Sequence, residues 1–164
     1  MEPGVKAAIR FCPVQGYQNV LDHMNSLNET QLFELCGSLY SYPFSEQEFL
    51  EDVRFLNYPE GLYGYAEGKD AFLQVRKCQG AEAILASVFV SPALRGRGMG
   101  GRLLMHCLDY LRQNGIGKVR LNVFSHNPAL RLYKSLGFSI RGSRAGYFPD
   151  GRPLKKLFME KQIL

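Results

Sequence analysis

The sequence predicts a mixed α/β fold in a single domain covering residues 1–164, a length sufficient to enclose a hydrophobic core. Two observations support this fold class. Short runs rich in β-branched residues alternate with segments whose apolar residues recur at helical spacing. A glycine-rich turn near the middle of the chain also joins one such run to a helical pattern. The expected order is a strand, helices, three strands, a helix, a strand, a helix and two strands.

The N-terminal half is expected to begin with a strand over residues 5–11 and to continue with helices. Asn28 is a suitable N-cap for a helix that carries apolar residues at helical spacing. The run Ser45-Glu46-Gln47-Glu48 has the pattern of a capping box and predicts the start of another helix. Residues 62–66 and 71–76 then flank a turn and predict a β-hairpin.

The C-terminal half should contain the longest strand, residues 83–90, followed by a helix that ends at Asn114-Gly115. Pro128 suits the first turn of a later helix that runs to Leu136. The remaining strands are expected at 119–124, 138–140 and 154–161, with a turn at 147–151. The residues of the long helix that should face the core are Leu103, Leu104, Cys107, Leu108 and Leu111.

Composition excludes several classes of protein. The net charge of +5 would suit a nucleic-acid binder, but the basic residues are scattered apart from those at 95–102 and 155–156, so we expect no nucleic-acid partner. No apolar run is long enough to span a membrane, and no signal peptide is visible, so we expect a cytoplasmic protein with no membrane partner. The four cysteines are widely spaced, which predicts reduced thiols and no metal site.

The glycine-rich turn, Arg95-Gly96-Arg97-Gly98-Met99-Gly100-Gly101, is a candidate anion site. Glycine permits a tight turn and a close approach of ligand to backbone, and the first N–H groups of the following helix have no internal partner. Such groups bind phosphate well. A P-loop is excluded because Arg102 follows Gly101 where that motif has Lys, and the glycine spacing differs from that of the dinucleotide fingerprint.

The pattern Arg-x-x-Gly-x-Gly at 95–100 resembles the acetyl-CoA pyrophosphate loop of the GNAT superfamily of N-acetyltransferases. Residues 121–138 resemble the second signature of that family, in which a strand ends near Asn and a helix carries Leu-Tyr before Gly-Phe. The resemblance implies acetyl-CoA as donor and an amine as acceptor. It also implies a mostly antiparallel sheet of about seven strands flanked by helices and splayed between the fourth and fifth strands.

The resemblance assigns roles to individual residues. Tyr133 would protonate the leaving CoA thiolate as general acid, although a core aromatic beside Leu132 and Leu136 is the alternative. Asn127 would bind the pantetheine arm, although the family's usual spacing from the Tyr would instead place His126 there. The other cofactor-binding residues would be the strand backbone at Val88, Phe89 and Val90, with groups of Val88 and Val90 unpaired, and the turn Arg95, Gly96, Arg97, Gly98, Met99, Gly100 and Gly101.

A general base is harder to assign. The two positions at which family members carry a carboxylate are occupied here by Ile84 and Asn122. Glu82 points to the same face of its strand as Ile84 and could act as base through a water molecule. The alternative is that there is no dedicated base, which would favour weakly basic acceptors, because an α-amine has a pKa near 8 and a lysine amine near 10.4.

The acceptor pocket is expected to include the aromatic side chains of Tyr42, Phe44 and Tyr147, which could alternatively only cap the core. The loop at 42–46 loosely resembles that of ribosomal-protein N-terminal acetylases. We expect direct attack by the amine in a ternary complex, without an acyl-enzyme and with a small amine as acceptor. The alternatives are acetylation of a protein N-terminus or lysine, and a CoA-binding module without catalysis. A homodimer remains an open option.

Overall fold

The computed structural model describes residues 9–12, 18–55, 63–66, 71–77, 80–90 and 96–164. Its strands form one seven-stranded sheet in the order β1-β2-β3-β4-β5-β7-β6, in which only the β4–β5 pair is parallel. The predicted fold class is therefore confirmed, while the extent of a single domain over 1–164 stays a prediction. The elements are β1 (Ile9–Cys12), α1 (Gln18–Asn25), α2 (Glu29–Cys36), α3 (Glu46–Phe55), β2 (Tyr63–Ala66), β3 (Ala71–Lys77), β4 (Glu82–Val90), α4 (Met99–Gln113), β5 (Lys118–Phe124), α5 (Ala129–Ser135), β6 (Ser139–Tyr147) and β7 (Pro153–Gln162).

The starts of α2 and α3 follow from local side-chain chemistry. Asn28 caps α2 through a complete capping box, in which its side chain accepts from the Gln31 backbone and the Gln31 side chain accepts from the Asn28 backbone. At α3 the Ser45 hydroxyl accepts from the Glu48 N–H at 3.2 Å. The Glu48 carboxylate, however, accepts from the hydroxyl of Ser41 at 2.6 Å, so the acid ties the preceding loop to the helix. Of the strand expected at 5–11, only Ile9 and the residues after it are described.

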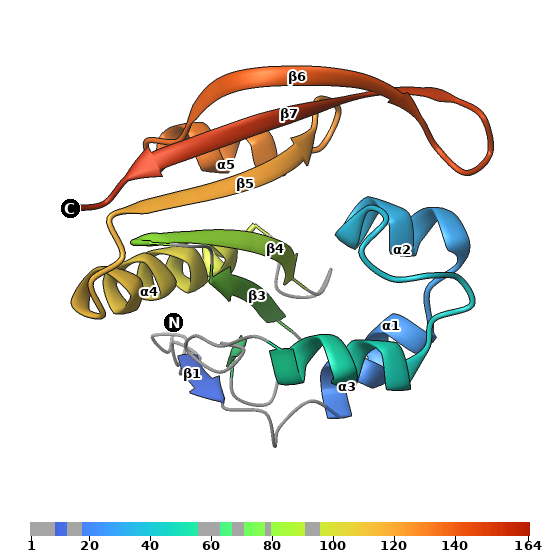
Figure 1. Cartoon of the computed structure of the whole chain (residues 1–164), viewed down its shortest axis with the longest axis horizontal. Helices are drawn as coiled ribbons and strands as arrows, with labels where there is room; N and C mark the ends of the chain where they lie inside the picture. The colour runs from blue at the N-terminus through green and yellow to red at the C-terminus, as the bar shows by residue number, and fades with distance from the viewer. Residues whose placement is uncertain (1–8, 13–17, 56–62, 67–70, 78–79, 91–95) are drawn as a thin grey trace, which may run out of the picture.

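Strands β4 and β5 are paired only at one end. Glu82–Leu85 of β4 pair with Lys118–Leu121 of β5, and no pairing continues beyond Leu85. The two halves of the sheet then diverge, and α2 lies in the opening between them (Figure 1). The predicted splay between the fourth and fifth strands is thus confirmed.

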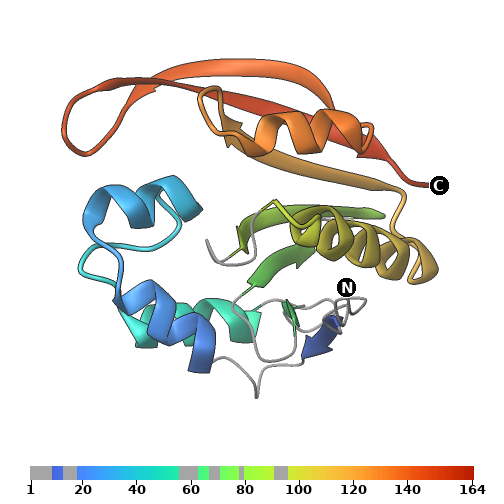
Figure 2. The ribbon, with the colours of Figure 1, turned by 180° about the vertical axis from the view of Figure 1, so that it is seen from behind.

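Two groups of buried side chains hold the fold together. The larger one joins β3, β4, β5 and α4, and it contains all five α4 residues expected to face inward. Helices α4 and α5 cover the face of the sheet seen from behind (Figure 2). The smaller group contains Leu21 and Met24 of α1, Tyr40 of the loop after α2 and Phe49 of α3, and Leu35 and Cys36 of α2 pack against it. The smaller group thus fixes α1 and α3 next to the opening that contains α2.

The C-terminal hairpin is longer than the sequence predicted. Strand β6 runs to Tyr147 instead of ending at Ile140, and β7 with 10 residues is longer than β4 with 9, which was expected to be the longest. The segment after Ile140 is mostly exposed and contains Gly142 and Gly146, so it lacks the apolar alternation of a half-buried strand. Its pairing with β7, through a bulge between Ile140 and Gly142, makes it a strand.

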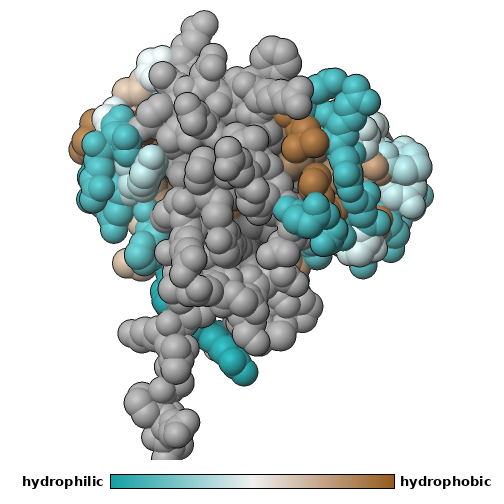
Figure 3. Space-filling model, turned by 90° about the horizontal axis from the view of Figure 1, so that it is seen from below, coloured by the Kyte–Doolittle hydropathy of each residue, from teal (hydrophilic) through white to brown (hydrophobic). Residues whose placement is uncertain are grey.

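One face of the molecule shows where hydrophilic and hydrophobic side chains lie among the described residues (Figure 3). Seen from below, the side chains at both margins are mostly hydrophilic, and a smaller hydrophobic patch is exposed nearer the middle (Figure 3). None of the helices in the described part of the chain has the length and apolarity that a membrane span requires. Within the same residues, no group of three or more His, Cys, Asp and Glu side chains is arranged to hold a metal ion.

Candidate active site

A cavity of about 390 Å³ lies where β4 and β5 separate. Its walls come from residues 34–39 of α2 and the following loop, and from the diverging parts of β4 and β5. Asn127, Tyr133 and Lys156 complete the walls. The splay of the sheet therefore creates an interior space that is bordered by β4 and by residues of the second signature segment, 121–138.

The described part of the glycine turn begins at Gly96 and leads directly into α4. Gly96 and Gly98 have φ angles of 74° and 73°, which other residues rarely adopt, so glycine is required by the backbone at these two positions. Gly98 is the N-cap of α4 and provides no side-chain hydrogen bond to the first-turn N–H groups. These groups and the exposed Arg97 are suited to an anion. Arg95 lies outside the described residues.

The start of α4 packs tightly against α5. A Cβ atom placed on Gly100 would lie 3.3 Å from Cδ2 of Leu132 and 3.6 Å from Cγ2 of Val90. Gly101 would similarly approach Leu132, at 3.5 Å from Cδ1. The absence of side chains at Gly100 and Gly101 thus brings the glycine turn, the end of β4 and the helix of Tyr133 together.

Tyr133 belongs both to the main core and to the cavity wall. It is 7% exposed, and its ring lies 6.0 Å from that of Phe138 in an edge-on arrangement. Among the described residues no group forms a hydrogen bond with its hydroxyl. Burial raises the pKa of Tyr133 to about 12, so the hydroxyl keeps its proton at neutral pH. It can therefore donate a hydrogen bond into the cavity, while its role as general acid stays a prediction.

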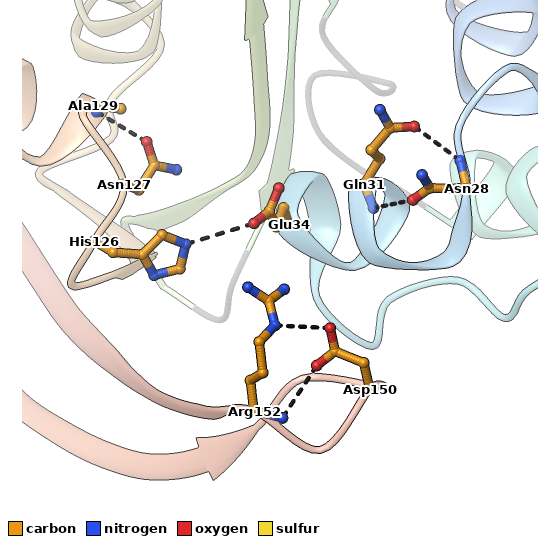
Figure 4. A network of polar contacts seen from close by, with 8 residues as sticks. All are labelled: Asn28, Gln31, Glu34, His126, Asn127, Ala129, Asp150 and Arg152. Atoms are coloured by element: carbon orange, nitrogen blue, oxygen red, sulfur yellow. Dashed lines mark hydrogen bonds and ion pairs between the residues drawn. The ribbon is translucent and has the colours of Figure 1, made fainter.

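Asn127 and His126 occupy different places, although they are adjacent in sequence. The Asn127 Oδ1 atom accepts from the Ala129 N–H at 2.9 Å, which helps to start α5 (Figure 4). Asn127 also lies on the cavity wall, and none of the described residues accepts a hydrogen bond from its NH₂ group. His126 is turned toward α2, with its Nε2 atom 3.6 Å from Oε1 of Glu34. This arrangement is compatible with Asn127 as the pantetheine-binding residue, a role that stays a prediction.

Glu82 lies at the paired end of β4, and it is not among the described residues that line the cavity. Its carboxylate contacts Lys118 Nζ at 3.0 Å and Arg120 Nε at 3.4 Å. The hydrogen bond from Lys118, followed by the charges of Lys118 and Arg120, holds the pKa of Glu82 below its usual value. By contrast, Ile84 and Asn122 both line the cavity.

The three aromatic residues expected at the acceptor pocket are not on the described cavity wall. Phe44 packs against Tyr40 and Phe49 in the smaller core group. Tyr42 and Tyr147 are 49% and 73% exposed. A role for these residues in binding the acceptor stays a prediction.

The sequence analysis did not single out residues 34–39 or Lys156, which the structure places on the cavity wall. The helical pattern of α2 predicts a helix, but it does not predict which element the helix faces. Phe89 is described as part of β4, and its ring lies 3.7 Å from that of His23 in α1.

Residues 21–138 match the acetyltransferase (GNAT) family, and the chain belongs to this family. The protein is thus an acetyltransferase. The chain is 31% identical over 140 residues to the [ribosomal protein bS18]-alanine N-acetyltransferase of Escherichia coli K12, an alignment that covers 80% of this chain and 92% of that protein.

Two solved structures extend this likeness to the fold. The ribosomal-protein-S18-alanine N-acetyltransferase of Escherichia coli superposes with a TM-score of 0.70 and 25% identity, covering 95% of this chain and 94% of that one. The structure of yncA from Salmonella typhimurium with its cofactor acetyl-CoA superposes with a TM-score of 0.72 and 24% identity, covering 98% and 95% of the two chains.

Proposed function

We propose that this protein transfers the acetyl group of acetyl-CoA to the α-amine of a protein N-terminus. The observation that carries the proposal is the 31% identity to a ribosomal protein bS18-alanine N-acetyltransferase over 92% of that protein's length. The cavity at the divergence of β4 and β5 supports it, because residues of the second signature, Asn127 and Tyr133 among them, border that cavity.

The residues at the turn and along the opening fit acetyl-CoA as donor substrate. The first-turn N–H groups of α4, which have no side-chain cap at Gly98, would hold the pyrophosphate. The register of β4 with β5 runs to Leu85, and the pantetheine arm would lie along the following stretch of β4, Val88 to Val90. The free NH₂ of Asn127 would donate to that arm. Tyr133 would donate its proton or a hydrogen bond to the sulfur.

Direct attack in a ternary complex is favoured over an acyl-enzyme. In attack by the amine, a bond forms between its nitrogen and the thioester carbonyl carbon, and the carbon–sulfur bond breaks as CoA thiolate leaves. Cys36 borders the cavity, but its thiol donates to the Leu32 carbonyl at 3.2 Å, and burial raises its pKa to about 12. Cys36 is therefore a poor nucleophile near neutral pH. Cys107 is buried in the core, where it cannot meet substrate.

The absence of carboxylates at Ile84 and Asn122 supports an α-amine acceptor. At pH 7 roughly 200-fold more of an α-amine than of a lysine amine is neutral, given reference pKa values near 8 and 10.4. Because only the neutral amine attacks, and removing a proton from an α-amine costs less free energy than removing one from lysine, an active site without carboxylates at these two positions suits an α-amine better than lysine. The small amine expected from the sequence is the second candidate, since the composition of the cavity wall does not exclude it.

The proposal is tested by combining calorimetry with an acceptor panel. Acetyl-CoA should bind saturably, and turnover should be fastest with an alanine-initiated peptide. The controls are the same peptide with a blocked N-terminus and one internal lysine, and a small aliphatic diamine. Faster turnover of either control would contradict the proposed acceptor. Tight CoA binding without acetyl transfer would instead identify a CoA-binding module without catalysis.

A further inference from the structure

Glu34 lies at the junction of two cavities. It borders the cavity between β4 and β5, and also a second cavity lined by the loop after β5 and the turn before β7. Among the described residues on the wall of the first cavity it is the sole carboxylate. The side chain is 45% exposed, so an incoming substrate can reach it.

A cluster of aromatic rings holds Glu34 and its partner in place. The His126 ring stacks on Phe124 with a centroid distance of 5.9 Å and an interplanar angle of 13°. Phe33, the neighbour of Glu34 in α2, stacks on the same Phe124 ring at 5.4 Å. Phe148 contacts all of these rings from the turn before β7. Three segments far apart in sequence thus fix the 3.6 Å contact between Glu34 and His126 (Figure 4).

The other charged groups around the junction leave Glu34 as the group best placed to receive an ammonium ion. Arg152 lies over the Phe148 ring at 4.6 Å and pairs with Asp150 at 2.7 Å. Lys155 and Lys156 border the second and the first cavity and carry positive charge. A cationic amine is repelled by the lysines and attracted by Glu34.

We propose that Glu34 binds the ammonium form of the acceptor and that the pair Glu34–His126 removes its proton. This inference rests on the proposed function. The ammonium ion gives up a proton through Glu34 to the unprotonated Nε2 atom of His126, which leaves a neutral amine and an imidazolium. The amine then attacks the thioester as described above, the proton that its nitrogen loses on forming the amide balances the proton that the CoA thiolate takes up, and the imidazolium returns its own proton to solvent.

The same arrangement explains how the chain functions without a carboxylate at Ile84 or Asn122. Those positions lie on the strands, whereas Glu34 approaches the cavity from the helix on the other side of the opening. Glu82, which the sequence suggested as general base, already contacts the cations Lys118 and Arg120 at the paired end of β4. In this protein the carboxylate that takes part in proton removal would therefore lie on α2 instead of on a strand of the sheet.

The test compares Glu34→Gln with wild type, using whichever amine the wild-type enzyme acetylates in the panel. If only a small amine is accepted, the proposed acceptor class fails while Glu34 is still tested on that amine. At pH 6.5 we expect kcat/KM to fall by about 100-fold, a loss typical of removing a proton-transfer group. The melting temperature and the affinity for acetyl-CoA should not change. Glu29→Gln, on the same helix but outside both cavities, is the matched control and should behave as wild type.

The pH dependence distinguishes a chemical role from a structural one. The activity of Glu34→Gln should rise with pH until the free α-amine is neutral near pH 8, so that the deficit at pH 9 is much smaller than at pH 6.5. Of the other titratable groups on the two walls, Cys36 and Tyr133 have pKa values raised to about 12, and Arg152, Lys155 and Lys156 are cationic. Glu34→Asp, which keeps the carboxylate, should recover part of the activity.

Three outcomes would overturn the inference. The first is a kcat/KM for Glu34→Gln within twofold of wild type. The second is a deficit that is the same at every pH. The third is a parallel loss of acetyl-CoA affinity and melting temperature, which would make the 3.6 Å contact with His126 a purely structural link between α2 and β5. For His126→Gln, whose side-chain amide cannot take up a proton, undiminished turnover would remove His126 from the mechanism.

Discussion

Strands β4 and β5 lie side by side at one end and apart at the other, and the two ends differ in chemistry. At the paired end Ala83 and Val119 are 0% exposed and lie in the main core. At the separated end the same strands border a cavity together with Tyr133 and the polar residues Asn122, Asn127, Glu34 and Lys156. Because the pairing of β4 with β5 stops at Leu85, the same two strands form part of the core at one end and border a cavity at the other.

The largest effect is expected at the separated end, for Tyr133→Phe. Loss of a placed proton donor should lower kcat by about 100-fold, or about 2.7 kcal/mol in activation free energy. Stability should barely change, because no hydrogen bond to this hydroxyl occurs among the described residues. Steady-state kinetics and thermal unfolding measure the two quantities. With a pKa of about 12, Tyr133 should also cause no decline of wild-type kcat up to about pH 10. Undiminished turnover of the variant would remove the acid role.

The opposite result is expected at the paired end, for Val119→Ala. This side chain is 0% exposed, and removal of its two methyl groups should cost about 2 kcal/mol in free energy of unfolding. At temperatures well below the transition, kcat and the affinity for acetyl-CoA should be as in wild type. Urea unfolding measures the loss, and Ile140→Ala, at a position that is 44% exposed, is the control with a smaller expected cost. A large kcat defect in stable Val119→Ala would show that the two ends are coupled.

The features predicted from the sequence depend on local chemistry. Asn28 caps its helix because its side chain reaches an N–H group three residues on, and Gly96 and Gly98 adopt positive φ angles in a turn where the sequence is rich in glycine. The apolar pattern of α4 likewise predicts its buried face, because helical periodicity is encoded within the segment. For these elements the neighbouring residues contain the needed information.

The features that were missed depend on contacts between distant segments. Strand β6 extends through Gly142 and Gly146 because β7 pairs with it, although glycine disfavours a strand locally. Glu34 reaches the cavity only because α2 lies across the opening from β5, which its own helical pattern does not reveal. Alternation places Glu82 on the same face as Ile84, but the parallel register that pairs Glu82 with Lys118 is not readable from either strand alone.

The smallest effect is expected for Glu82→Gln, which tests whether this acid belongs to the paired end or to the reaction. Glu82 contacts Lys118 and Arg120 and is absent from the described cavity wall, so kcat/KM should stay within about twofold of wild type, as for most surface substitutions.

The pKa of Glu82 is lowered from 4.5 in the folded state by the hydrogen bond from Lys118 and the nearby cations. Because the pKa of Glu82 is lower in the folded chain than in the unfolded chain, its ion pairs stabilise the fold fully at pH values above the pKa of the unfolded chain. This stabilisation is lost as the pH falls through the pKa of the folded chain. The difference in stability between wild type and variant, measured by urea unfolding, should therefore be constant above about pH 5.5, and it should shrink below about pH 4.5 and in high salt. A tenfold loss of kcat with normal stability would instead return Glu82 to the reaction and contradict the division between the two ends.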